Sequence, residues 1–125
     1  MILIFGGSYQ GKLDYARQLE SFDENEIFFC GKEASLDLSK KIIYGLENFV
    51  FGCVYEKKEA KEILMENQKL IEDKIIILSD ISQGIVPMDP LEREWREMNG
   101  RTMLYLGQQA DKVFRVFCGL GQRIK

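Results

Sequence analysis

The chain contains no histidine among its 125 residues. Imidazole is the side chain that most readily exchanges a proton near neutral pH, and it is also a common metal ligand. Its absence excludes a histidine base, a histidine nucleophile and a histidine-ligated metal within this chain. Hydrolytic triads of the Ser-His-Asp kind and most zinc sites are excluded with it.

Cysteine and long apolar runs are also scarce. Cys30, Cys53 and Cys118 lack the spacing of a metal site, and each lies in or beside an apolar stretch. We therefore expect buried, reduced thiols in a cytoplasmic protein. No apolar run approaches the roughly 20 residues that span a bilayer, so no membrane association is expected. The apolar start lacks the basic residues and the cleavage site of a signal peptide.

The chain also has no surplus of positive charge. Its 17 Lys and Arg are outnumbered by 20 Asp and Glu, which gives a net charge of −3. The basic residues are scattered, which is typical of a solvated surface, and no nucleic-acid partner is expected. The length fits a single domain, residues 1–125, and the 46% hydrophobic content is enough for one core.

Short apolar runs alternate with amphipathic stretches along the chain. The runs are rich in Ile, Val and Phe, which predicts strands buried on both faces. They cover residues 2–5, 26–30, 48–54, 74–78 and 112–118. Helices are expected at 11–21, more weakly at 36–46, at 57–72, and from residue 89 onward. This order predicts a three-layer α/β sandwich around a mostly parallel sheet of about five strands. Ligands bind at the carboxyl ends of such strands, here the loops after residues 5, 30, 54 and 78.

The last helix has a clear start. Asp89 suits the N-cap, Pro90 suits the first helical position, and Glu92 completes a pattern like a capping box. An apolar stripe with spacings of three and four residues follows, and we expect it to pack in the core rather than bind a ligand. The stripe consists of Leu91, Trp95, Met98, Thr102 and Leu106.

A glycine-rich segment follows the first predicted strand. It consists of Gly6, Gly7, Ser8, Tyr9, Gln10, Gly11, Lys12 and Leu13. It matches the phosphate-loop pattern G-x-x-x-x-G-K-[ST] up to the last position. The glycines allow successive N–H groups to face one anion at the start of a helix, and Lys12 would reach the outer phosphates of a nucleotide. The alternative is an ordinary glycine-rich turn with a surface lysine.

Leu13 is the departure from the pattern. A Ser or Thr hydroxyl normally coordinates Mg²⁺ there, and leucine has no oxygen to offer. We expect Leu13 to pack into the core instead. A triphosphate could still bind the N–H groups and Lys12.

The two ends of the chain carry further motifs. Near the N-terminus these are Gly6, Gly7, Gly11, Lys12 and Ala16. The C-terminal set is Gly84-Ile85-Val86-Pro87, Arg93, Arg96, Gly100, Arg101, Ala110, Asp111, Val113, Gly119 and Lys125. Together they closely resemble the adenosylcobinamide kinase / adenosylcobinamide-phosphate guanylyltransferase family, over roughly the first 30 and last 50 residues. The resemblance implies a P-loop NTPase-like fold, GTP or ATP with Mg²⁺, a corrinoid substrate, and a homo-oligomer such as a trimer.

The departures from this family are equally informative. The family histidine that becomes guanylylated has no counterpart here, so transfer through that intermediate is excluded. The family strand that ends in an acid followed by Cys is aligned with Phe51-Gly52-Cys53, which puts a glycine at a Mg²⁺-supporting position. The family segment T-N-E becomes Leu78-Ser79-Asp80, which keeps a carboxylate, and N-Q becomes Met103-Leu104. Mg²⁺ support is thus expected to be lost at Leu13 and Gly52.

Two hypotheses follow. In the first, the chain is an active cobinamide kinase that uses a nucleoside triphosphate, with Lys12 on the phosphates and Asp80 as base or metal ligand. Three arginines would then contact substrate or phosphate, or else form ion pairs with Glu92, Glu94 and Glu97. They are Arg93, Arg96 and Arg101. In the second, favoured here, the chain is a divergent member that binds nucleotide or phosphate and has lost guanylyl transfer and most or all kinase activity.

Overall fold

The computed structural model describes residues 1–81 and 89–125. Within these ranges the strands are β1 (Ile2–Gly6), β2 (Ile27–Phe29), β3 (Ile42–Tyr44), β4 (Ile75–Ser79), β5 (Lys112–Phe117) and β6 (Leu120–Arg123). They form one sheet in the order β2-β3-β4-β1-β5-β6. All neighbours pair in parallel except β5 and β6, which form an antiparallel hairpin. The expected α/β fold with a mostly parallel sheet is confirmed.

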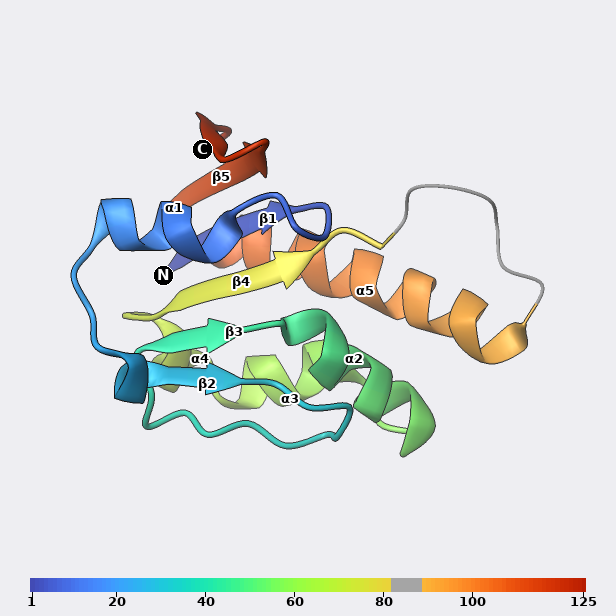
Figure 1. Cartoon of the computed structure of the whole chain (residues 1–125). Coiled ribbons are helices and arrows are strands. Elements are labelled where there is room, and N and C mark those ends of the chain that lie inside the picture. Colours follow the sequence, from blue (N-terminus) through green and yellow to red (C-terminus); the bar gives the residue numbers. More distant parts are fainter. Residues whose placement is uncertain (82–88) are drawn as a thin grey trace.

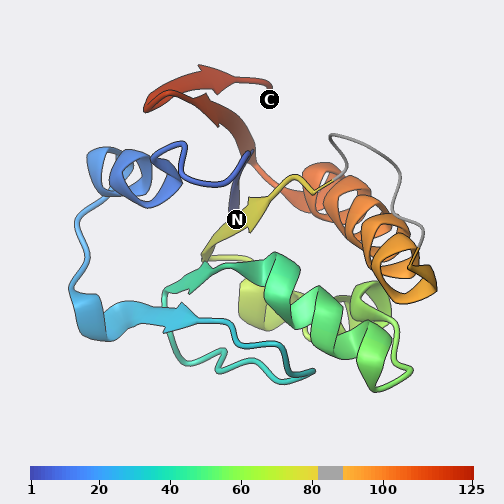
Figure 2. The ribbon, with the colours of Figure 1, turned by 45° about the vertical axis from the view of Figure 1, so that its right-hand side comes forward.

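Helices cover both faces of this sheet (Figures 1 and 2). They are α1 (Lys12–Leu19), α2 (Leu46–Tyr55), α3 (Ala60–Glu66), α4 (Gln68–Ile71) and α5 (Pro90–Gln109), and a 3-10 turn (Glu24–Glu26) precedes β2. Helix α1 covers one face, where Ala16 packs with Ile4, Ile77 and Phe114. The other helices cover the opposite face, around Phe49 and Leu106. The fold is therefore a three-layer sandwich of the P-loop NTPase-like kind.

The prediction of a strand at residues 48–54 is wrong. This segment lies in α2, because its buried side chains recur at helical spacing and so face the sheet together. They are Leu46, Phe49, Val50, Cys53 and Val54. The expected helix at 36–46 is also wrong, since these residues form turns followed by β3. Val54 therefore does not end a strand, and the strand that leads into this helix is β3, which ends at Tyr44.

Other boundaries need smaller corrections. The helix expected at 57–72 is divided at Asn67 into α3 and α4. Strand β6 was not predicted, because all four of its residues are exposed and they carry no apolar alternation. Cys30 and Cys53 are buried as expected, but Cys118 is exposed at the tip of the β5–β6 hairpin. Burial raises the pKa of both the Cys30 and the Cys53 thiols to about 12.

The start of α5 is as predicted. Asp89 Oδ1 accepts a hydrogen bond from the N–H of Leu91, and Pro90 occupies the first helical position. Met98, Thr102 and Leu106 from the apolar stripe are buried. The motif Gly84–Pro87 lies outside the described residues. Among the residues that are described, no helix is long and apolar enough to cross a membrane.

Candidate phosphate-binding site

The glycine-rich segment forms a tight loop between β1 and α1, as its pattern predicts. Gly11 has a φ of +84°, a conformation that favours glycine, and its carbonyl accepts the N–H of Tyr15 in the first turn of α1. Tyr9 also has a positive φ, 59°, and its side chain is fully exposed. The loop therefore turns back over the start of α1, where the positive end of the helix dipole favours an anion.

Neighbouring strands hold this loop at both ends. The N–H of Asp80, just after β4, donates to the carbonyl of Gly6 at 2.8 Å. Gln10 is bound to the turn of the β5–β6 hairpin: its carbonyl accepts the N–H of Gly119, and its side-chain Oε1 accepts the N–H of Cys118 at 2.7 Å. The loop is thus pre-organised by contacts to strands far away in the sequence.

Lys12 is buried, with only 5% of its surface exposed. Its Nζ donates to the carbonyl of Gly7 at 2.6 Å, across the loop. Burial lowers the pKa of Lys12, and the nearby charge of Glu47 partly offsets that effect. Lys12 is therefore not a surface lysine, because its ammonium group is held against the loop.

Leu13 packs as expected. Its side chain is partly buried against the apolar cluster between α1 and the sheet. It also contributes to the wall of the pocket beside the loop. The position therefore serves packing and offers no oxygen to a metal.

A pocket of about 480 Å³ opens beside the loop. One wall consists of loop residues and the start of α1: Ser8, Tyr9, Gln10, Gly11, Lys12, Leu13 and Asp14. The other wall comes from the carboxyl ends of β3 and β4 and from the start of α2: Tyr44, Glu47, Asn48 and Ser79. This is the edge where parallel sheets bind their ligands.

The sequence did not predict four residues of this pocket, Asp14, Tyr44, Glu47 and Asn48, and Glu47 is the most informative of them. It lies in the first turn of α2, and its Oε1 accepts a hydrogen bond from the N–H of Ser79 at 2.9 Å. Its backbone carbonyl accepts the indole N–H of Trp95 at 2.8 Å. The helical spacing of Leu46, Phe49 and Val50 was the signal that could have placed Glu47 at the start of a helix.

The alignment of Gly52 with a Mg²⁺-supporting acid is wrong. Gly52 lies inside α2, and a Cβ there would come within 2.3–2.5 Å of the backbone of Glu33. It is a glycine because the chain passes too closely for any side chain. The strand that precedes this helix is β3, which ends at Tyr44, and Glu47 is the carboxylate that follows it.

Of the other candidate residues, Asp80 is bonded to the loop and the three arginines lie on α5. Asp80 directly follows β4 and is bonded through its N–H to Gly6. Arg93 and Arg96 lie in the first two turns of α5. Arg101 lies further along α5, where its guanidinium donates twice to Glu59 Oε1, at 2.9 and 3.1 Å. Its ion-pair partner is thus Glu59 rather than Glu92, Glu94 or Glu97.

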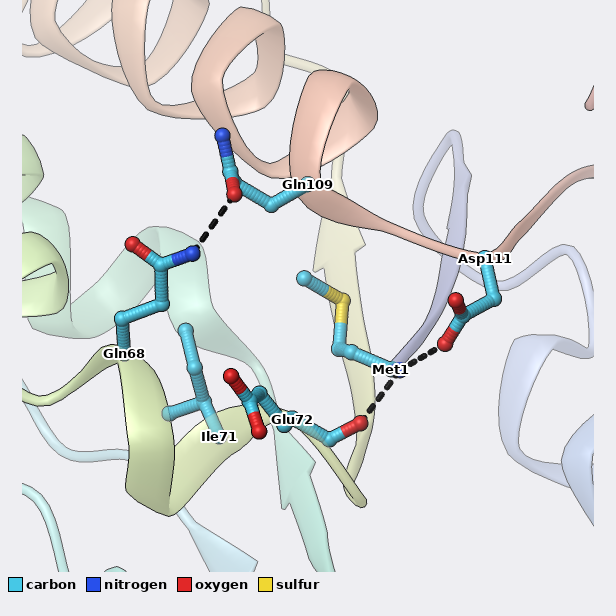
Figure 3. Close-up of a pocket in the computed structure, with 6 residues that line it drawn as sticks. All are labelled: Met1, Gln68, Ile71, Glu72, Gln109 and Asp111. Carbon is cyan, nitrogen blue, oxygen red and sulfur yellow. Dashed lines mark hydrogen bonds and ion pairs between the residues drawn. The ribbon is translucent and has the colours of Figure 1, made fainter.

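A second pocket, of about 360 Å³, lies at the opposite edge of the sheet (Figure 3). Its polar groups bind one another: the amino group of Met1 contacts Asp111 at 2.6 Å, and Gln68 donates to Gln109 at 2.7 Å. The hydrogen bond and charge of the amino group lower the pKa of Asp111. These contacts join the amino ends of β1 and β5 to α4 and α5, so the pocket is a structural junction. It lies at the amino ends of these strands, whereas parallel sheets bind their ligands at the carboxyl ends.

The fold and the loop together define the class of this protein: a three-layer α/β protein with a phosphate-loop pattern at the carboxyl edge of its sheet. The family model for cobinamide kinase / cobinamide phosphate guanyltransferase matches residues 38–124, more than half of the chain. The chain belongs to this family.

Two curated relatives support this assignment. The bifunctional adenosylcobalamin biosynthesis protein CobU of Salmonella typhimurium is 30% identical over 67 residues, and that of Escherichia coli K12 is 28% identical over 67 residues. Each match covers 54% of this chain and 37% of the relative. The matched part is thus well under half of either relative. The family match also begins after the phosphate loop, so the loop is assigned from its own pattern and geometry.

Proposed function

We propose that this chain binds a nucleotide, GTP or ATP, with its phosphates on the loop Gly6–Leu13, and that it does not transfer a guanylyl group through a histidine. The observation that carries the proposal is the buried Lys12, whose Nζ lies across a loop that strands β4 and β5 hold in place. Charge-assisted hydrogen bonds from such a group to phosphate contribute about 1.5–3 kcal/mol each. The missing histidine accounts for the loss of guanylyl transfer.

Calorimetric titration of GTP and of ATP into the protein tests the binding step. Saturable binding of either nucleotide at micromolar to millimolar concentration, weakened by substitution of Lys12, supports the proposal. Absence of binding at millimolar nucleotide, with or without Mg²⁺, would refute it. Incubation with GTP labelled in the α-phosphate should leave no label attached covalently to the protein.

Retention of the kinase step is a second candidate function. Two carboxylates favour it, because Glu47 lines the pocket and Asp80 follows the adjacent strand. Either could hold a metal or accept the proton of a substrate hydroxyl. Incubation with γ-labelled GTP or ATP, Mg²⁺ and cobinamide separates the two functions, since label on cobinamide would establish phosphoryl transfer. Corrinoid binding and assembly as a homo-oligomer are further proposals that rest on the family.

A further inference from the structure

Glu47 and Lys12 place opposite charges in the same pocket without neutralising each other directly. In the described part of the chain they form no ion pair: Nζ of Lys12 is bound to the carbonyl of Gly7, and Oε1 of Glu47 to the N–H of Ser79. Their charges still interact, because Glu47 partly restores the pKa of Lys12. A ligand between them therefore meets a cation on one side and a carboxylate on the other.

A phosphate alone fits only half of this environment. Its oxygens suit Lys12 and the N–H groups of the loop, but the carboxylate of Glu47 repels them. A divalent cation bound to the phosphate reverses that repulsion, since carboxylate and phosphate oxygens are the ligands that Mg²⁺ prefers. The pocket is complementary to a phosphate and its cation together.

The residues present fit such a cation. Among residues 1–81 and 89–125, no three carboxylates, thiols or imidazoles come together as a metal site of their own. Mg²⁺ at nucleotide sites does not require one, because it takes one or two carboxylates together with phosphate oxygens and water. Glu47 is also fixed in place, at its side chain by Ser79 and at its carbonyl by Trp95.

We propose that the pocket binds a nucleotide as its divalent-metal complex, with the carboxylate of Glu47 as the protein's ligand to the metal. Glu47 then supplies, from α2, the oxygen that Leu13 does not supply from α1. This inference rests on the proposed nucleotide binding. Mg²⁺ with the nucleotide is what the family resemblance implies, and the inference adds the residue of this chain that binds it. Asp14 also lines the pocket from α1, but its side chain is exposed, and it serves as the comparison in the test below.

Titrations of GTP into the wild type, Glu47→Gln and Asp14→Asn, each in Mg²⁺ and in EDTA, test the inference. The wild type should bind GTP roughly 10- to 150-fold more tightly in Mg²⁺, the range for one interaction between charged groups. Glu47→Gln should lose most of this difference in affinity between Mg²⁺ and EDTA. Part of the loss should come from tighter binding in EDTA, because the neutral amide no longer repels a metal-free phosphate. Asp14→Asn should keep it. In Glu47→Gln the new amide oxygen can still accept the N–H of Ser79, and unchanged thermal unfolding would show that the variant folds.

The possible results distinguish failure of the metal-binding role of Glu47 from failure of the proposed nucleotide binding. Equal affinity of the wild type in Mg²⁺ and EDTA would overturn the metal role and leave nucleotide binding intact. If Glu47→Gln kept the full Mg²⁺ effect on GTP binding, Glu47 would not be the metal ligand. If that variant also lost phosphoryl transfer to cobinamide, Glu47 would act as a base instead. No binding by the wild type in either condition would overturn both proposals.

Discussion

Replacement of Lys12 by methionine should separate stability from ligand binding. Methionine is also unbranched and fills similar space, but it lacks the ammonium group that Lys12 buries in the loop. The lost hydrogen bond to Gly7 O is worth about 1.5–3 kcal/mol. Removal of a desolvated charge, whose burial lowers the pKa of Lys12, gives back a comparable amount. We therefore expect the free energy of unfolding to change by less than about 1 kcal/mol.

Nucleotide affinity should respond much more strongly to the same substitution. Loss of one charge-assisted contact to phosphate, at about 1.5–3 kcal/mol, raises the Kd for GTP by roughly 10- to 150-fold. Urea unfolding measures the first quantity and calorimetric titration the second.

Lys74→Met is the matched control for Lys12→Met. Lys74 is equally buried and donates to the carbonyl of Lys40 at 2.7 Å, but it lies at the amino end of β4, away from the loop. Its replacement should leave the Kd for GTP unchanged. If Lys12→Met binds GTP within about threefold of the wild type, a change of under 1 kcal/mol, the phosphate-binding role of Lys12 is wrong.

Four further predictions follow from the same contacts. Burial makes the pKa of Lys12 lower in the folded protein than its ordinary value of 10.5. Between these two pKa values the unfolded chain binds more protons than the folded chain, so a rise in pH favours folding. Urea unfolding should therefore show that the stability of the wild type, relative to Lys12→Met, rises as the pH increases towards 10.5. Gly52→Asp should lower the free energy of unfolding by about 1–3 kcal/mol and should not increase the Mg²⁺ dependence of GTP binding. Gly100→Ala, in α5 with open space around it, should be neutral or stabilising by up to about 1 kcal/mol, and equal thermal unfolding of the two variants would contradict the packing argument. Arg101→Ala should cost at most about 1 kcal/mol of stability and leave the Kd for GTP within about twofold, because its partner is Glu59, and a larger loss of affinity would place Arg101 at the site. A thiol reagent should label one cysteine rapidly, Cys118, while Cys30 and Cys53 react only on unfolding, and fast labelling of all three by mass spectrometry would be inconsistent with this burial.

The sequence was informative where local signals and tertiary packing agree. The glycine pattern after an apolar run predicted β1, the loop and α1, and the cap at Asp89 predicted the start of α5. Residues 46–54 were ambiguous, because a short apolar run fits both a buried strand and a helix whose buried face is broad. Burial of Phe49, Val50 and Cys53 against the sheet decides for the helix.

The pocket wall that α2 contributes could not be predicted, because the sequence did not show that residues 46–54 form a helix. Glu47 reaches the pocket only because α2 begins where it does, and the contacts that fix it come from Ser79 and Trp95, 32 and 48 residues further along the chain. No local pattern encodes such contacts. At Gly52 the sequence suggested a functional loss where the reason is packing. The glycine was interpreted as the replacement of a metal-binding acid, but it is required because the backbone of Glu33 passes too close for a side chain.

The most direct test of nucleotide binding is a titration of the ¹⁵N-labelled protein with GTP and Mg²⁺, followed by NMR at each backbone amide. We expect the largest shifts at the amides of residues 7–13, where the phosphates are proposed to bind, and smaller shifts at Glu47 and Ser79 across the pocket. Shifts concentrated instead around Met1, Gln68 and Asp111, or no shifts at saturating nucleotide, would contradict it.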